Sequence, residues 1–571
     1  MNMIKTCGAV LLVTISLAGC KKSYLDIAPK NFLSDDAVWA STANADLFLN
    51  DIYNQLPDIN NETEHLDQYT DNSDVGVLWM NGYAKVATAQ ITPSSLPTGP
   101  WDMWTWDKNY QKIRRCNLFI QKVAASQLPG DYKTQRIAEA RFIRALLYHW
   151  IWMAYGGVPV IKDVLDNVTQ GDSIYRPRNT ERETFAFIDN ELDTISKMLP
   201  PSYGAADFGR PTSGAALTLK GWCELYEASP LRNPGQDPNL WKAASATNKQ
   251  VMQLGVYDLV SDFTQLFLAG DNNSIESVFA RQYGPNHGST IIGKEGPTMN
   301  AAVAEVSWGN FQPTQELVDE FSMSNGKAIA DPGSGYDPQH PYDNREDRFY
   351  KTILYDGAPW RGFTISTRDG GNNSIDLGYA SDKTHTGYYA RKRLDSAMDP
   401  GSYFSGICYQ NYMYFRYAEV LLSFAEAENE VNGPTADVLA AVDKVRTRGN
   451  LPGIAAAYGA VNQSQMRDII RRERRVELCF EDKRWWDVLR WKIAEKMPDG
   501  SPGVLNRPEI GMVITGTTGN LTYTRTNVRN RIFLPKMFLM PIPQFALDQN
   551  PAMQKQSGGT DGWTNGQNPG Y

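Results

Sequence analysis

The fold is decided by one charged and aromatic stretch near the C-terminus, which reads RRERRVELCFEDKRWWDVLRW over residues 471–491. It contains no Gly or Pro, and most of its residues tolerate an α-helix, so a helix is predicted here. Phe480, Trp485 and Trp486 are too large to be left idle on a wet surface. At least one side of this helix is therefore predicted to be buried.

Charged residues lie among these aromatic side chains. Glu473, Glu477 and Glu481 recur every four residues, so they share one helix face and repel one another unless cations separate them. Because a buried charge without a partner is very costly, we expect ion pairs with arginines such as Arg474 and Arg484. A catalytic carboxylate pair is the alternative. Charge-laced helices usually serve structure, so we favour a structural helix stabilised by ion pairs.

This stretch resembles the C-terminal signature of the SusD/RagB family of outer-membrane nutrient-binding lipoproteins. The family pattern is E-R-R-x-E-L-x-F-E-G-x-R-W-x-D-L-x-R-W. It is matched here by Glu473, Arg474, Arg475, Glu477, Leu478, Phe480, Glu481, Arg484, Trp485, Asp487, Arg490 and Trp491. Asp482 stands in place of the usual Gly, and Val488 in place of Leu. Residues 139–161 resemble the family's N-terminal signature, and the resemblance extends over essentially the whole mature chain.

The resemblance implies a mainly α fold, in which tetratricopeptide-like helical repeats support a loop-rich ligand-binding face. It also implies a cell-surface lipoprotein that covers a SusC-like TonB-dependent transporter and captures oligosaccharides for import, without catalysis. Some relatives capture peptides, so a peptide-capturing RagB-like lipoprotein is one alternative, and a glycoside hydrolase is another. The family's ligand contacts lie outside its signature motifs, so no site residue is carried over from them.

Helical periodicity divides the chain into two regions. Helices are predicted at residues 133–155, 181–199, 213–228, 241–254, 416–431 and 435–448, whereas residues 271–405 favour strands and loops. The first of these helices is apolar on two faces, so it is predicted to lie between neighbours, with His149 packed inside. We expect a signal peptide at residues 1–19, a helical region at 20–270 and a C-terminal region at 271–571. The two regions are expected to pack as one globular unit.

The N-terminus has the pattern of a lipoprotein signal peptide. Lys5 precedes an apolar run of about a dozen residues, which is too short to span a bilayer. The run ends in Leu17-Ala18-Gly19-Cys20, which resembles a bacterial lipobox. We therefore expect Cys20 to be lipidated and to be the membrane attachment at the outer membrane, since several acyl chains anchor a protein stably.

Composition and motifs argue against several other functions. The net charge of −8 without a basic block argues against nucleic-acid binding. The five histidines are far apart, and the sequence has no nucleophile elbow, zinc-protease motif, P-loop or dinucleotide fingerprint. The acidic run at residues 71–74 lacks EF-hand spacing, so a solvated turn is expected there. No catalytic residue, metal or cofactor is predicted.

Loop aromatics are the candidate ligand-binding residues. A sugar ring has apolar C–H faces that suit flat Trp or Tyr rings, and hydroxyl edges that suit Asn, Asp or Arg. Residues 65–106 form a long irregular segment, and such segments are often functional. The predicted site residues, with Trp101 and Trp308 as the leading pair, are Trp79, Tyr83, Trp101, Trp104, Trp308 and Trp360. The alternative for each ring is that it packs its own loop.

Overall fold

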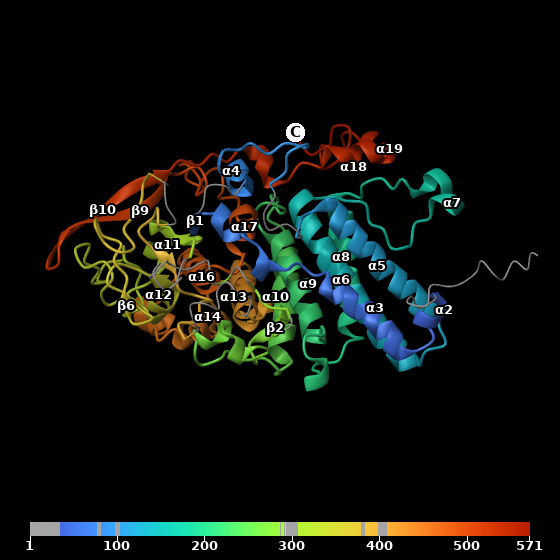
Figure 1. Ribbon diagram of the computed structural model, residues 1–571, viewed down its shortest axis with the longest axis horizontal. Helices are drawn as coiled ribbons and strands as arrows, with labels where there is room; N and C mark the ends of the chain where they lie inside the picture. Colours follow the sequence, from blue (N-terminus) through green and yellow to red (C-terminus); the bar gives the residue numbers. More distant parts are fainter. Residues whose placement is uncertain are drawn as a thin grey trace, which may run out of the picture.

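The structure is a computed structural model that describes residues 35–76, 81–97, 103–285, 287–289, 292, 307–378, 383–397 and 408–571. Long helices form a row across the molecule, each packed on its neighbour in chain order (Figure 1). In the N-terminal half the long helices are α3 (Thr42–Asn54), α5 (Trp106–Ala125), α6 (Gly130–Tyr155), α8 (Glu181–Ser196), α9 (Ser213–Ala228) and α10 (Pro238–Gln253). This confirms the predicted mainly helical fold with its repeated helix pairs.

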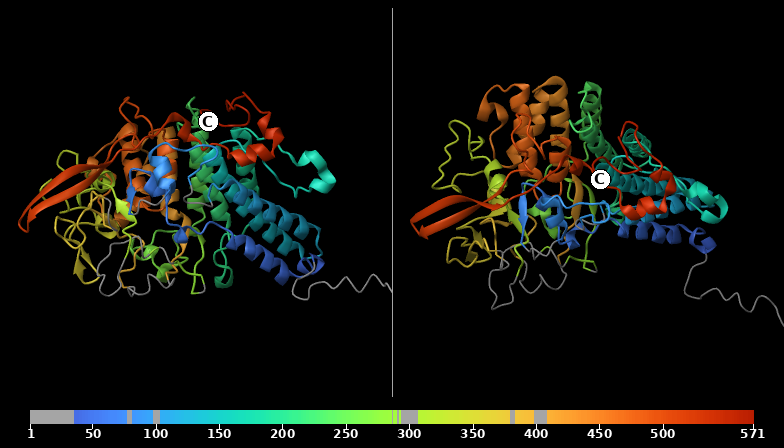
Figure 2. Two further views of the ribbon diagram at one scale, coloured as in Figure 1. Left: turned by 45° about the horizontal axis from the view of Figure 1, so that its top comes forward. Right: turned by 90° about the horizontal axis from the view of Figure 1, so that it is seen from above.

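The row of helices continues into the C-terminal half. Helix α13 (Tyr417–Asn432) packs on α10, although a long irregular segment separates the two in the chain. Helices α14 (Ala436–Arg448) and α16 (Gln463–Leu478) then pack on α13, and the short α15 (Ile454–Tyr458) lies between them in sequence. The two sequence regions therefore contribute to one continuous helical array, which both views in Figure 2 show.

Helix α6 illustrates why the sequence folds as it does. Its side chains are apolar on more than one face, and Phe142, Leu147 and Trp152 are all fully buried. The helix packs against both α5 and α8, so it has no wet face over most of its length. It ends at Gly156, whose φ of 73° suits a residue without a side chain. The prediction of a helix enclosed by its neighbours is confirmed.

Short strands pair within the irregular parts of the described chain. All five pairs are antiparallel: β1 (Ser73–Val75) with β3 (Phe311–Pro313), β2 (Ser277–Arg281) with β8 (Tyr412–Arg416), β4 (Ile353–Leu354) with β7 (Tyr389–Ala390), β5 (Pro359–Trp360) with β6 (Phe363–Thr364), and β9 (Glu509–Thr517) with β10 (Asn520–Arg529). The β9–β10 hairpin projects from the left of the molecule in Figures 1 and 2. The β1–β3 pair joins the N-terminal part of the chain to the C-terminal part.

The remaining elements are short. They are α2 (Asp35–Val38), α4 (Asn81–Ala87), α7 (Asn167–Gln170), α11 (Gln315–Glu320), α12 (Asp347–Thr352), α17 (Arg484–Arg490), α18 (Gln544–Gln549) and α19 (Pro551–Gln554). Single 3₁₀ turns are η2 (Ile59–Asn61), η3 (Leu66–Tyr69), η4 (Gly171–Ile174), η5 (Ala205–Asp207), η6 (Gln265–Phe267), η7 (Ala269–Asp271) and η11 (Pro535–Phe538). Within the described ranges, no helix combines the length and the hydrophobicity needed to cross a membrane.

The signature stretch is not one continuous helix, which corrects the prediction for residues 471–491. Helix α16 ends at Leu478, and α17 begins at Arg484. Phe480 and Asp482 adopt the left-handed conformation, with φ of 61° and 60°. This conformation favours glycine, which explains why the family pattern has Gly at the position of Asp482. The Nζ of Lys392 donates to the carbonyls of Glu477 at 3.0 Å and Cys479 at 2.8 Å, so the carbonyls at the helix end are satisfied.

The glutamates of the signature are paired, as predicted, but by arginines from other elements. Glu477 accepts from Arg416 at 2.6 Å and from Arg348 at 3.1 Å, and it also pairs with Arg448. Burial alone would raise the pKa of Glu477, but the three guanidinium groups outweigh it and hold that pKa below its usual range. Pairs of the same kind join Glu473 to Arg348 and Arg446, and Glu481 to Arg416 and Lys392.

The arginines of the signature pair elsewhere, so the predicted partners were wrong. Arg474 bonds to Asp487 at 2.8 Å and Glu419 at 3.2 Å, and Arg484 bonds to Asp71. These ion pairs between residues far apart in the sequence connect α16 and α17 to β8, α12, α14 and the N-terminal irregular segment. The geometry fits the structural interpretation of the stretch.

Candidate ligand-binding site

The β1–β3 pair brings two of the predicted aromatic segments together. Asp74 lies opposite Gln312, and the ladder continues where the N–H of Gly76 donates to the carbonyl of Asn310 at 3.2 Å. A Cβ on Gly76 would lie 2.4 Å from the carbonyl oxygen of Trp308, so only glycine allows this approach. The chain that leads to Trp79 and the loop that carries Trp308 therefore start side by side.

The side chain of Trp308 is half-buried. Its ring packs against the edge of the main hydrophobic core, which holds one face of the loop in place. Among the predicted aromatic residues that the structure describes, Trp308 is the one whose ring is not fully enclosed. Trp79, Trp101 and Cys20 lie outside the described residues.

A buried polar cluster surrounds the β1–β3 pair and holds it in place. Asp74 lies 3.2 Å from the Nη2 of Arg529 and 3.4 Å from the Nδ1 of His385. Burial alone would raise the pKa of Asp74, but the contacts with His385 and Arg529 outweigh it and lower that pKa. Gln312 joins the cluster, because its Oε1 accepts from the N–H of His385 at 2.7 Å. Strands β1 and β3, which lead into the segments of Trp79 and Trp308, are thus held in place by ion pairs and hydrogen bonds.

Tyr83 is part of this scaffold. Its ring is 2% exposed and lies under the guanidinium of Arg529, 4.9 Å from the ring centre, and its hydroxyl donates to Glu509 at 3.3 Å. Burial raises the pKa of Tyr83 well above its usual value. In this structure the ring offers no face on which a ligand stacks.

Trp104 and Trp360 are also enclosed. Trp104 is 3% exposed, lies parallel to Tyr69 at 6.3 Å between ring centres, and meets Trp485 edge-on at 6.5 Å. Trp360 packs in a separate hydrophobic cluster with Tyr389 and neighbouring apolar side chains. Their positions give both rings a packing role, which is the alternative that the sequence left open for each aromatic residue.

The acidic run at residues 71–74 is buried, so the predicted solvated turn is wrong. Asp71 is bound by Arg475 and Arg484, and Asn72, Ser73 and Asp74 are fully enclosed. Nothing in the local sequence marks this burial, because both arginines come from the distant signature stretch. Across the described ranges, no group of three or more His, Cys, Asp or Glu side chains is arranged to hold a metal ion.

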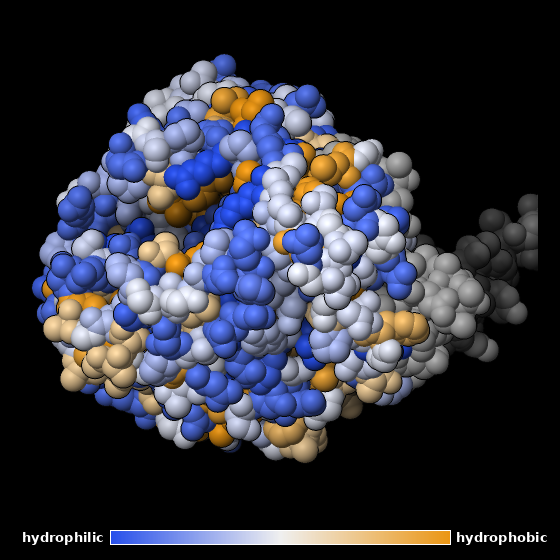
Figure 3. Space-filling model, turned by 90° about the vertical axis from the view of Figure 1, so that its left-hand side faces the viewer, coloured by the Kyte–Doolittle hydropathy of each residue, from blue (hydrophilic) through white to orange (hydrophobic). Residues whose placement is uncertain are grey.

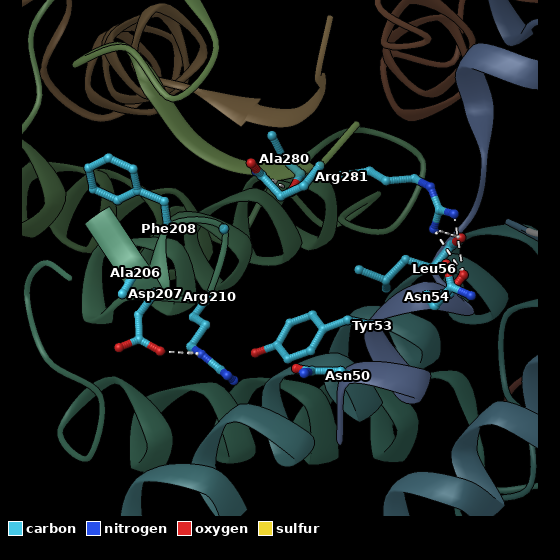
Figure 4. A pocket seen from close by; sticks show the side chains of 12 residues that line it. Asn50, Tyr53, Asn54, Leu56, Ala206, Asp207, Phe208, Arg210, Ala280 and Arg281 are labelled. Atoms are coloured by element: carbon cyan, nitrogen blue, oxygen red, sulfur yellow. Dashed lines mark hydrogen bonds and ion pairs between the residues drawn. The ribbon is translucent and has the colours of Figure 1, made fainter. Parts of the chain in front are cut away.

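Two further cavities have aromatic and polar walls. The first, of about 370 Å³, lies between α3, residues 206–210 and β2 (Figure 4). At its base the hydroxyl of Tyr53 donates to the buried Glu139 at 2.8 Å, and the Nη1 of Arg210 lies 2.8 Å from the same carboxylate. Phe208, a largely exposed ring, stands at its edge. These groups form a mixed apolar and polar wall suited to a small polar ligand.

The second cavity, of about 580 Å³, lies between the start of α5, the loop around α7 and helices α18 and α19. Trp106 and Tyr110 line it together with Tyr175 and Phe545. Tyr110 is only half-buried, and its hydroxyl donates to the carbonyl of Pro159 at 2.8 Å. Sequence reasoning missed this wall, because Phe545 comes from the far end of the chain and gives no local signal.

Comparison with known proteins identifies the family. Residues 275–571 match the SusD family, and residues 23–220 match a family described as "Starch-binding associating with outer membrane". This chain belongs to the SusD family. A SusD-like protein of Bacteroides ovatus is 24% identical over 568 residues, which are 94% of this chain and 92% of that relative.

Solved SusD-like structures share the fold. A SusD-like protein of Bacteroides fragilis superposes with a TM-score of 0.76 at 25% identity, over 95% of this chain and 100% of the other. A SusD-like carbohydrate binding protein of the same species gives a TM-score of 0.74 at 24% identity, over 90% and 99% of the two chains. The family resemblance seen in the signature stretch is therefore confirmed.

Proposed function

We propose that this SusD-family protein captures oligosaccharides by stacking their sugar rings on loop aromatics from both halves of the chain, without catalysis. The observation that carries the proposal is the β1–β3 pair, which starts the segment leading to Trp79 beside the loop that holds Trp308. Two rings on neighbouring segments suit two successive sugar units of one ligand, because each sugar has an apolar face. Trp101 and Trp308 remain the leading pair of the proposed site, and Trp79 is the next candidate ring.

The proposal extends to location and partner. Cys20 is proposed to be lipidated and to hold the protein at the outer membrane on the cell surface, where a SusC-like TonB-dependent transporter takes over the captured ligand. The lipobox-like sequence before Cys20 supports the anchor. The family description that names association with the outer membrane supports the location.

Isothermal titration calorimetry with a panel of neutral oligosaccharides tests the site. Wild-type protein is compared with Trp79→Ala, Trp101→Ala and Trp308→Ala. Loss of one stacking ring is expected to cost about 1–3 kcal/mol, by analogy with bases stacked on aromatic side chains, which is roughly tenfold or more in affinity. The melting temperature of Trp308→Ala is expected to change little, because the ring is at the edge of the core.

Phe208→Ala is the matched control, since Phe208 is an exposed ring at the edge of the cavity in Figure 4. If Phe208→Ala weakens binding and the three tryptophan variants do not, the ligand site is that cavity. Capture of peptides with no binding of any oligosaccharide would favour the RagB-like alternative. Release of shorter sugars during the titration would favour a glycoside hydrolase.

A further inference from the structure

A third cavity, of about 510 Å³, lies beside the signature stretch, between α11, α16 and residues 491–507. Trp491, Ile493 and Met497 give it an apolar wall. Five arginines line the rest of it: Arg471, Arg472, Arg475, Arg484 and Arg507. Figure 3 shows the side of the molecule that carries the β9–β10 hairpin as largely hydrophilic, with a hollow near the top whose floor is hydrophobic.

Three of the five arginines have carboxylate partners within the protein. Arg484 binds Asp71 at 2.8 Å, and Arg475 binds both Asp71 at 3.0 Å and Glu320 at 2.8 Å. Arg472 lies 3.5 Å from the same Glu320. These ion pairs build the wall of the cavity and neutralise two of its acidic groups, Asp71 and Glu320.

The other acidic residues of the lining are largely occupied or exposed. Asp319 bonds to Arg525 at 2.9 Å, and Glu316 accepts from the N–H of Ile510 at 3.1 Å. Burial raises the pKa of Glu316 to about 7, so this carboxyl is partly protonated at neutral pH. Asp468 is on the exposed rim.

Arg471 differs from its neighbours on α16. Arg467 and Arg475 flank it at a spacing of four residues, and both are paired, with Glu430 and Asp71 respectively. No carboxylate of the described chain lies within ion-pair distance of Arg471, and its Nε is buried without an acceptor. The guanidinium carbon lies 4.8 Å from the centre of the Trp491 ring, which holds the group against the apolar wall.

Glu426, an acidic neighbour whose charge acts on Arg471, is engaged elsewhere. Glu426 accepts from both terminal nitrogens of Arg490 at 2.6 Å and from the Nε1 of Trp491 at 2.6 Å. Across the cavity, the Nε of Arg507 donates to the carbonyl of Pro502 at 2.9 Å, and its guanidinium has no ion pair with a described carboxylate. Two guanidinium groups therefore face the same space without an acidic partner from the described protein.

The half-buried guanidinium of Arg471 is costly without a charged partner, and the planar guanidinium forks of Arg471 and the exposed Arg507 each match the two oxygens of an oxyanion. We propose that this cavity is a second ligand site, and that it takes a sugar ring that carries an oxyanion, either a uronate carboxylate or a sulfate ester. Arg471 and Arg507 bind the oxyanion, and the wall of Ile493 and Met497 receives the apolar face of the ring. The sugar part of this assignment rests on the proposed function; the oxyanion part rests on the two arginines.

Calorimetric titration with three probes tests the site: an oligogalacturonate tetrasaccharide, its carboxyl-reduced neutral counterpart, and a sulfated galactose tetrasaccharide. Arg471→Met keeps the apolar stem over Trp491 and removes the charge, and Arg507→Ala removes an exposed side chain. Arg115→Ala is the matched control, because Arg115 is a surface arginine paired with Asp51 outside the cavity.

We expect at least one acidic probe to bind wild type more tightly than the neutral counterpart. That affinity should fall at least about tenfold in Arg471→Met and in Arg507→Ala, as for loss of a charge-assisted hydrogen bond, and stay unchanged in Arg115→Ala. The carboxylate and sulfate probes tell the two oxyanions apart. If Arg471→Met does not fold, Arg507→Ala carries the test, because its side chain is exposed.

Three results would overturn the inference. They are equal affinity for the acidic and neutral probes, unchanged affinity in both arginine variants, or binding of free inorganic sulfate as tight as that of the acidic sugars. Failure here is separable from failure of the main site, because binding of the neutral panel depends on Trp308 and not on Arg471. Neutral binding that is lost in Trp308→Ala, with no response to Arg471→Met, would remove only the second site.

Discussion

Arg484 and Asp71 form a two-point ion pair across the molecule: Nε to Oδ1 and Nη2 to Oδ2 are both 2.8 Å, between residues 413 positions apart in the chain. Both side chains are buried, and Arg475 approaches the same carboxylate at 3.0 Å. Asp71 comes just before β1, the strand that positions the proposed ligand site. The signature stretch therefore supports the proposed ligand face in part through the carboxylate of Asp71.

Asp71→Asn should destabilise the fold strongly. The change removes the carboxylate that pairs with the buried Arg484 and one of the two that pair with Arg475. Breaking a buried ion pair by removing one partner typically costs about 3–5 kcal/mol. Urea unfolding of wild type and variant measures the difference. Arg115→Ala, which breaks a pair between side chains that are 39% and 47% exposed, is the control and should cost less than about 1 kcal/mol. Equal, small losses in both variants would contradict the role given to Asp71.

Trp485→Ala should cost about 3–5 kcal/mol of stability, because the ring is 1% exposed and packs against Tyr69, Trp104 and Phe533. Trp485→Phe should cost less, since a smaller cavity remains. Denaturant midpoints of the three proteins give the comparison. A Trp485→Ala protein of wild-type stability that had lost only ligand binding would show that the ring serves function instead of packing.

The helices could be predicted because their signals are local. Helix α9 spans the residues predicted for it, since its apolar periodicity, its N-cap Thr212 and the residues that end it are all within the segment. The break between α16 and α17 was missed, because it depends on two residues with positive φ and on Lys392, which arrives from a distant loop. Helix propensity is a property of the local sequence, so it does not predict a contact with a distant residue such as Lys392.

The site was harder to predict, because burial of a loop aromatic is decided by distant chain. Trp104 is enclosed by Tyr69 and by two tryptophans of the signature, and Trp360 by Tyr389. No pattern around Trp104 distinguishes it from Trp308, whose ring is half-buried at the edge of the same core. The ion-pair partners of the signature glutamates could not be predicted for the same reason. Arg348 and Arg416, which pair with Glu477, come from elements far from it in sequence.

Cys20→Ala should release the protein from the membrane. The lipobox-like residues 17–20 predict that acyl chains on Cys20 are the attachment, and several chains are needed for stable anchoring. Cell fractionation in a strain that lacks the partner transporter measures the effect, because no second protein then retains the variant. The Cys116→Ala protein is the control, since Cys116 is a buried thiol of α5. A Cys20→Ala protein that stays in the membrane fraction would place the anchor elsewhere.

Stability should fall as the pH is lowered from neutral, in part because of His149. The ring is buried in α6, its Nδ1 lies 2.9 Å from the carbonyl of Leu146, and burial lowers its pKa to about 3, against an ordinary value of 6.5. Between these two values the unfolded chain binds a proton that the folded chain does not, so acid favours unfolding. The contribution of this residue is lost as the pH falls below about 6.5, at up to about 1.4 kcal/mol for each pH unit.

His149→Leu should remove that part of the pH dependence. Urea unfolding of wild type and variant at pH 7 and pH 5 gives the measurement, and the variant should lose less stability between the two. His340→Leu is the control, since His340 is on the surface and the pKa of its ring is raised by a hydrogen bond to Asp337. Because a histidine whose pKa is raised favours the folded state in acid, His340→Leu should shift the pH dependence slightly in the opposite direction. If wild type and His149→Leu lose stability in parallel from pH 7 to pH 5, the buried ring is not held neutral by the fold.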